Sequence, residues 1–375
     1  MTTNPYADLP DHAFWRRAVV APAPGEIDPV ADVPFDFTPQ ARVVTAGSCF
    51  AQHIGRYLQA SGCAFLVTER PHPLVTENAA RILNYGVFTA RYGNVYTARQ
   101  LRQLFQRAYG AFRPAEDVWT QGDGTLVDPF RPHIQPRGFN SEREFAADRE
   151  RHFRAVREAF QTLDVLVFTL GLTEAWRSRV DGAVFPICPG VSGGVFSAQR
   201  HEFVNFGVDD IVGDMTAFIA DLRAVNPRAR IILTVSPVPL VATASGAHVL
   251  AATTYSKSVL RVAAETLASK VRDVSYFPSY EIVMAGRDGA PYFAADRRSV
   301  TEEGVAHVMR VFTKHYVRAH DPSILRRVVS SLLPPRPEPA PASPAEAMQA
   351  ALKVMCDEEA LDWAKAEDAR SGAAE

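Results

Sequence analysis

The sequence contains no long hydrophobic run, and this absence excludes a membrane-spanning helix. No segment approaches the 18 or so consecutive apolar residues that a span requires. The first twenty residues also lack the apolar core of a secretory signal, because Asp8, Asp11 and residues 15–17 interrupt it early. We therefore expect a chain with no membrane span and no cleaved leader.

Cysteine and positive charge are also scarce. The four cysteines are widely spaced and include no C-x-x-C pair, which argues against a disulfide framework or a zinc ribbon and favours a cytoplasmic location. Forty Lys and Arg residues face 42 Asp and Glu residues, for a net charge of −2, whereas nucleic-acid binders usually carry a basic excess. Phosphate-loop, dinucleotide and H-E-x-x-H motifs are absent. We therefore expect no nucleic-acid partner, no cofactor and no metal.

The sequence does show a regular alternation of short apolar runs and amphipathic stretches. The strand-like runs are 42–45, 64–68, 165–170, 231–235 and 274–277, and the helix-like stretches are 50–60, 142–163, 209–225, 249–270 and 301–318. This order predicts an α/β fold, a three-layer sandwich around a mostly parallel sheet of about five strands. Glycine, proline and aromatic residues dominate 70–140 and 176–206, which predicts long loop insertions there.

Proline marks the ends of the chain. Many of the 27 prolines fall in the first 40 residues or between 334 and 341. These segments lack core-forming residues and favour extended structure. We therefore expect an extended N-terminal arm (1–40), one α/β domain (41–330), a proline-rich linker (331–345) and a C-terminal helical tail (346–375).

The first strand-to-helix turn carries the most informative motif. In sheets of this kind ligands bind beyond the carboxyl ends of the strands, and the first strand runs into Gly47-Ser48-Cys49 and then a helix. A hydroxyl at a helix N-terminus lies beside N–H groups that can hold an oxyanion, so Ser48 is well placed for acyl transfer. The alternatives are that Ser48 only caps the helix, or that Cys49 is the nucleophile or a buried structural residue.

The string Thr45-Ala46-Gly47-Ser48-Cys49-Phe50-Ala51 resembles the signature of the GSCFA family. Further similarity covers 169–176 and 236–239. That family resembles the SGNH (GDSL-like) hydrolases, serine esterases built on a flavodoxin-like sheet. The resemblance implies a flavodoxin-like, SGNH-type fold with Ser48 as the nucleophile.

The sequence departs from the SGNH pattern in its third block. The resemblance implies a Gly followed by an Asn whose amide completes the oxyanion hole, and here Gly171 is followed by Thr173 and Glu174. We expect Cys49, Gly171, Thr173 and Glu174 to form the oxyanion and substrate-binding set. A carboxylate repels an oxyanion unless it is protonated, so the alternative for Glu174 is an ion pair with Arg177.

The last SGNH block, Asp-x-x-His, is also altered. The carboxylate is present at Asp296, but Ser299 stands where the histidine is implied. Ser299 followed by Glu302 also has the spacing of a helix capping box. A serine nucleophile needs a nearby base.

Other histidines are therefore candidates for the base. His248 follows a flexible segment at the active end of the sheet, and we expect it to serve as the base with Asp296 in support. His72 and His133 are further candidates. His307 falls opposite the apolar face of its helix and is expected to be solvated.

These observations predict an SGNH-like serine hydrolase, an esterase or acyl-ester hydrolase acting on small esters or acylated glycans. Two alternatives stay open. The altered blocks fit a binding or regulatory protein that has lost catalysis on the same fold, and a glycan acyltransferase would use the same site with a different acceptor. The sequence leaves the oligomeric state open.

Overall fold

The computed structural model describes residues 4–23, 25–286 and 292–318. The expected linker 331–345 and helical tail 346–375 lie outside these residues. In the part of the chain that is described, no helix is long and apolar enough to cross a membrane.

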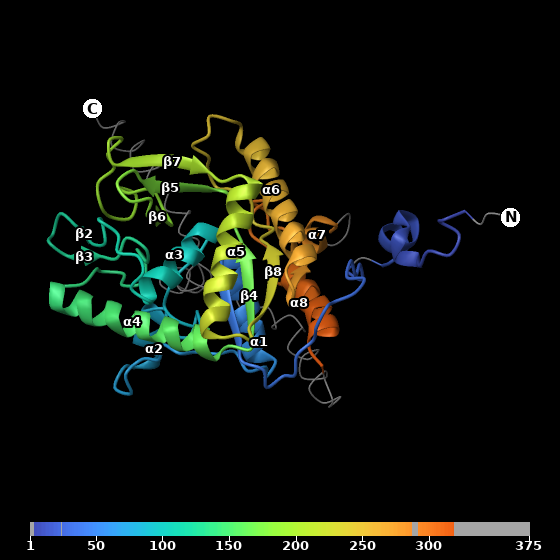
Figure 1. Ribbon diagram of the computed structural model, residues 1–375, viewed down its shortest axis with the longest axis horizontal. Helices are drawn as coiled ribbons and strands as arrows, with labels where there is room; N and C mark the ends of the chain where they lie inside the picture. Colours follow the sequence, from blue (N-terminus) through green and yellow to red (C-terminus); the bar gives the residue numbers. More distant parts are fainter. Residues whose placement is uncertain (1–3, 24, 287–291, 319–375) are drawn as a thin grey trace.

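A four-stranded parallel sheet lies at the centre of the molecule, in the order β1-β4-β8-β9 (Figure 1). Its strands are β1 (Val43–Gly47), β4 (Val165–Leu170), β8 (Arg230–Val235) and β9 (Val274–Phe277). β1 pairs with β4 from Val43↔Val165 to Gly47↔Thr169. The strands are almost wholly buried and apolar, as expected for a parallel sheet covered on both faces.

Side chains alternate between the two faces and build two cores. The helices are α1 (Cys49–Ala60), α2 (Glu77–Ile82), α3 (Ala98–Ala108), α4 (Glu142–Thr162), α5 (Val208–Val225), α6 (Val249–Lys270), α7 (Ser279–Met284) and α8 (Glu302–Tyr316). Val44, Leu166 and Leu233 pack with α3 to α6, whereas Val43, Val167 and Ile232 pack with α1, α7 and α8. The predicted three-layer α/β sandwich is confirmed.

The two irregular regions contain more regular structure than their composition indicates. The sequence predicts a strand over 64–68, but the structure has only an isolated bridge there, between Phe65 and Val43 at the edge of β1. Within 70–140, Thr97 and Gln100 form a capping box that starts α3. The second insertion holds the antiparallel sheet of β5 (Glu174–Ser178), β6 (Val184–Phe185) and β7 (His201–Asn205), and β2 (Trp119–Thr120) pairs with β3 (Leu126–Val127).

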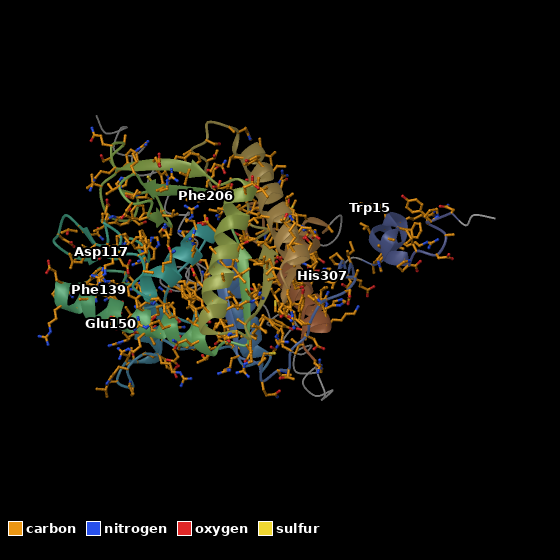
Figure 2. All side chains as sticks on the ribbon, viewed as in Figure 1. Trp15, Asp117, Phe139, Glu150, Phe206 and His307 are labelled. Carbon is orange, nitrogen blue, oxygen red and sulfur yellow. The ribbon has the colours of Figure 1, made fainter. Side chains whose placement is uncertain are left out.

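The segment before β1 runs along α8. Asp28 accepts hydrogen bonds from Lys314 and His315, and Phe37 bridges Val317. Farther toward the N-terminus the chain leaves the sheet, and Trp15 lies well away from it (Figure 2).

This segment overturns one expectation. His307 is buried rather than solvated, because its two ring nitrogens contact the Tyr292 hydroxyl at 2.7 Å and the Ile27 carbonyl at 2.8 Å. The apolar pattern of α8 identifies only the face that packs on the sheet, and the segment before β1 covers a second face. Burial lowers the pKa of His307.

Candidate active site

The turn from β1 into α1 depends on a glycine. Gly47 has a φ of +139°, and a Cβ atom there would lie 2.4 Å from the Thr169 carbonyl oxygen on the neighbouring strand. Only glycine fits this conformation and this close approach. The chain therefore turns directly against β4, and the Ser48 N–H donates to the Thr169 carbonyl at 3.3 Å.

Ser48 occupies the N-cap position of α1 but does not act as a cap. Its side chain makes no capping hydrogen bond. The residue is 4% exposed, and its Oγ has no hydrogen-bond partner among the described residues. An unsatisfied buried hydroxyl costs about 1–3 kcal/mol. Since capping does not explain the serine, a chemical role for the hydroxyl is the better interpretation.

Gly171, at the end of β4, lies directly against Ser48. A Cβ atom on Gly171 would be 2.9 Å from the Ser48 Cβ and 3.2 Å from the Tyr96 carbonyl oxygen. The N–H of Gly171 donates to that carbonyl at 3.0 Å, and the N–H of Thr173 donates to the Ser256 hydroxyl at 3.1 Å. Both backbone donors are therefore engaged, whereas the buried Thr173 hydroxyl has no partner within the described chain.

Glu174 does not pair with Arg177, contrary to the alternative drawn from the sequence. Arg177 lies opposite Glu202 in the β5–β7 ladder and forms its ion pair there. Glu174 instead accepts a hydrogen bond from the Thr243 hydroxyl at 2.7 Å, in the loop that leads to His248. Burial raises the pKa of Glu174, and the Thr243 hydrogen bond offsets part of this effect.

None of the described histidines hydrogen-bonds the Ser48 hydroxyl. His248 is exposed at the N-cap of α6, where its Nδ1 accepts the Leu250 N–H at 3.2 Å. His72 is also exposed, and His133 contacts the Ser192 hydroxyl at 3.1 Å. The structure therefore holds these three rings in other contacts.

Asp296 likewise hydrogen-bonds no histidine of the described residues. Its carboxylate accepts the Ser299 hydroxyl at 2.6 Å and the N–H groups of Arg298 and Ser299. Burial raises its pKa, but these hydrogen bonds outweigh burial and the pKa is lowered. The expected capping box at Ser299 is wrong: α8 begins at Glu302, and its N-cap is Thr301, two residues after Ser299. Ser299 instead closes the loop by bonding Asp296.

Sequence reasoning missed a buried lysine beside the site. Lys257 of α6 is 1% exposed, and its ammonium group donates to the Gly171 carbonyl at 2.7 Å. Because Gly171 contacts Ser48, a single residue, Gly171, connects Lys257 to the candidate nucleophile. A fully buried lysine is unusual, and this one follows Ser256, which holds the Thr173 N–H. No local motif distinguishes it from other lysines of an amphipathic helix.

A pair of buried amides was also missed. The Gln52 side chain donates to the Asn94 side-chain carbonyl at 2.9 Å. Gln52 lies one turn after Ser48 on α1, and the neighbour of Asn94, Val95, donates its N–H to the Gly47 carbonyl at 2.8 Å. An amide therefore stands close to the turn, although the third block lacks one.

Cys49 and metal binding are the remaining questions at this site, and the described residues address both. Cys49 is 4% exposed, which favours the interpretation of a buried structural side chain over a rival nucleophile. No group of three or more His, Cys, Asp and Glu residues in this part of the chain is arranged to hold a metal ion. The arrangement is therefore that of a buried serine beside a glycine, a lysine and two amides.

Comparison with known proteins identifies a family. A model of the GSCFA family matches residues 42–312. The match begins one residue before β1 and ends within α8, so it includes Ser48 and all four strands of the central sheet. No curated protein and no solved structure matches the chain.

Proposed function

Since the chain belongs to the GSCFA family, we propose that it is a serine hydrolase that cleaves acyl esters through Ser48. The observation that carries this proposal is the buried Ser48 hydroxyl at the start of α1, which neither caps the helix nor has another described partner. Nucleophiles at such turns are stabilised by the helix N-terminus, which also favours the negative charge of the tetrahedral intermediate.

The chemistry proceeds in two steps. The Ser48 oxygen attacks the acyl carbon, its proton passes to a base, and the alcohol leaves with a proton. Water then hydrolyses the acyl-serine and restores the hydroxyl. The oxyanion would form beside the first turn of α1, with Cys49 and the Thr173 hydroxyl as the expected donors, and Asn94 supplies an amide nearby.

Two residues are candidates for the base. His248 with support from Asp296 remains the assignment made from the sequence, because His248 follows a flexible segment at the active end of the sheet. It requires this segment, which contacts Glu174 through Thr243, to bring the ring to Ser48. Lys257 is the alternative that lies closer to the site, because it already bonds the residue in contact with Ser48. Lysine serves as the base in Ser–Lys enzymes on other folds.

The substrate class is an ester of a small molecule or a glycan. A small apolar cluster beside Gly171, formed by Tyr96, Leu172, Leu240 and Ala252, would contact the acyl chain. Transfer to a glycan acceptor instead of water would use the same residues.

The test is covalent labelling by a fluorophosphonate together with turnover of short-chain acyl esters. Ser48→Ala should abolish both, whereas the control Ser61→Ala, a buried serine at the other end of α1, should retain both. An inert wild type that binds esters would favour the binding-protein alternative.

The same assay assigns the base. If His248 is the base, His248→Ala lowers turnover by about 10²–10⁴-fold, and Lys257→Met lowers it less. The reverse order assigns the base to Lys257. Ester binding should change little in either variant, because the base acts on the proton and not on the acyl chain.

A further inference from the structure

A cavity whose lining includes none of the residues around Ser48 lies between α3, α4 and the loop that joins α3 to β2. Its volume is about 700 Å³, within the range of small-molecule sites. The α4 helix contributes residues 146, 149, 150, 153 and 157, which form a single stripe along the helix. Asp117 and Glu150, two carboxylates of its lining, lie at the far side of the molecule from His307 (Figure 2).

The lining carries an excess of positive charge. Four arginines, Arg107, Arg113, Arg149 and Arg157, face two carboxylates, which leaves a formal charge of +2. Arg149 bonds Asp117 at 2.7 Å, and Arg157 lies 3.5 Å from Glu150. Both carboxylates of the lining are therefore paired with these two arginines, and Arg107 and Arg113 have no partner within the lining; Arg107 shares Asp128, outside the lining, with Arg131.

Arg107 is the more buried of these two arginines. It is 7% exposed, and its guanidinium lies 3.7 Å from the Phe130 ring centroid and 5.2 Å from that of Phe153. The nearest carboxylate, Asp128, is 3.9 Å away and already bonds Arg131 at 2.8 Å. Burial lowers the pKa of Arg107 to about 10, so it remains charged at neutral pH.

Arg113 differs because it is exposed at the rim. It forms no ion pair with any other described residue. A buried, rigid guanidinium and a free one at the mouth of the same cavity can hold one anion between them, since arginine binds phosphate oxygens through paired N–H groups.

The rest of the lining is apolar and flat. Tyr109, Phe112 and Phe153 are half-buried and line the same cavity. A small inorganic anion would make no apolar contact with these rings. A phosphate monoester carries about −1.5 to −2 charges at neutral pH, which matches the excess of the lining.

We propose that this cavity binds a phosphate monoester carried on an aromatic or other flat apolar group, at a site separate from Ser48. Arg107 and Arg113 hold the phosphate, and the ring of the ligand lies against Phe112 and Phe153. The cavity shares no lining residue with the turn at Ser48. This inference therefore does not depend on the proposed hydrolase activity.

The test is calorimetric titration of the full chain with phenyl phosphate at low salt. We expect saturable binding that Arg113→Ala weakens by about 10- to 100-fold, the scale of one lost charge-assisted hydrogen bond. The matched control is Arg151→Ala, which removes the same charge from an exposed arginine of α4 outside the cavity and should leave binding unchanged.

Two further ligands separate the parts of the proposal. Inorganic phosphate and benzoate should each bind more weakly than phenyl phosphate, and Phe112→Ala should weaken phenyl phosphate but not inorganic phosphate. Absence of saturable binding would overturn the proposal. Equal losses in Arg113→Ala and Arg151→Ala would overturn it as well, because they would reveal only the general attraction of a basic surface.

Discussion

Removing the Ser48 hydroxyl should stabilise the protein while it removes the candidate nucleophile. The hydroxyl is buried without a partner, at a cost of about 1–3 kcal/mol, and alanine fits the same space with the loss of one oxygen atom. After the lost packing contacts of that atom are deducted, we expect Ser48→Ala to gain up to about 1–2 kcal/mol of unfolding free energy. A gain of 1 kcal/mol raises Tm by about 2 °C for a domain of this size.

The measurement is urea unfolding, with Ser279→Ala as the matched control. Ser279 is also fully buried, but its hydroxyl contacts the Thr234 hydroxyl at 2.5 Å and donates to the Val235 carbonyl at 3.0 Å. Its removal should lower the unfolding free energy by about 1–2 kcal/mol. If Ser48→Ala is destabilised as much as Ser279→Ala, the Ser48 hydroxyl has a structural partner and the argument for its chemical role fails.

Three other predictions follow from contacts near the site and along α8. Gly171→Ala should lose about 1–3 kcal/mol of stability and most fluorophosphonate labelling, because the added methyl group displaces Ser48; unchanged labelling would contradict this placement. Asp28→Asn should raise amide exchange across residues 26–34, whereas exposed Asp32→Asn should not. The lowered pKa of Asp28 means that its stabilisation holds above about pH 4 and is lost as the pH falls further. The lowered pKa of His307 means that the fold favours the neutral ring, so the unfolding free energy should fall as the pH drops below about 6.5. The urea midpoint of His307→Gln should fall less than that of the wild type over the same pH range.

The framework of the fold was predictable because it rests on short-range patterns. Residues 249–270 were expected to be helical, and α6 has those bounds. The strand-to-helix turn at Ser48 was likewise located from the apolar run before it and the amphipathic stretch after it. Such features depend on residues a few positions apart in the chain, so the sequence alone is enough to predict them.

The surroundings of the site were less predictable because they depend on distant segments. Lys257 resembles any helical lysine until the fold places it 86 residues away in sequence from its partner Gly171. The alternative of an ion pair between Glu174 and Arg177 rested on their closeness in the chain, but the β5–β7 ladder places Glu202 beside Arg177 instead. The sequence pattern therefore located the turn that carries Ser48 but not the groups around it.

The contact between the start of the chain and α8 has a consequence for biosynthesis. Ile27 reaches its partner His307 across 280 residues. At about 5–20 residues per second, a ribosome needs roughly 15–60 s to supply the second partner after the first has been made. During that interval the segment before β1 emerges without its docking surface, while β1 and β4 are already available to pair. The contact between Ile27 and α8 can therefore form only after the residues between them have been translated.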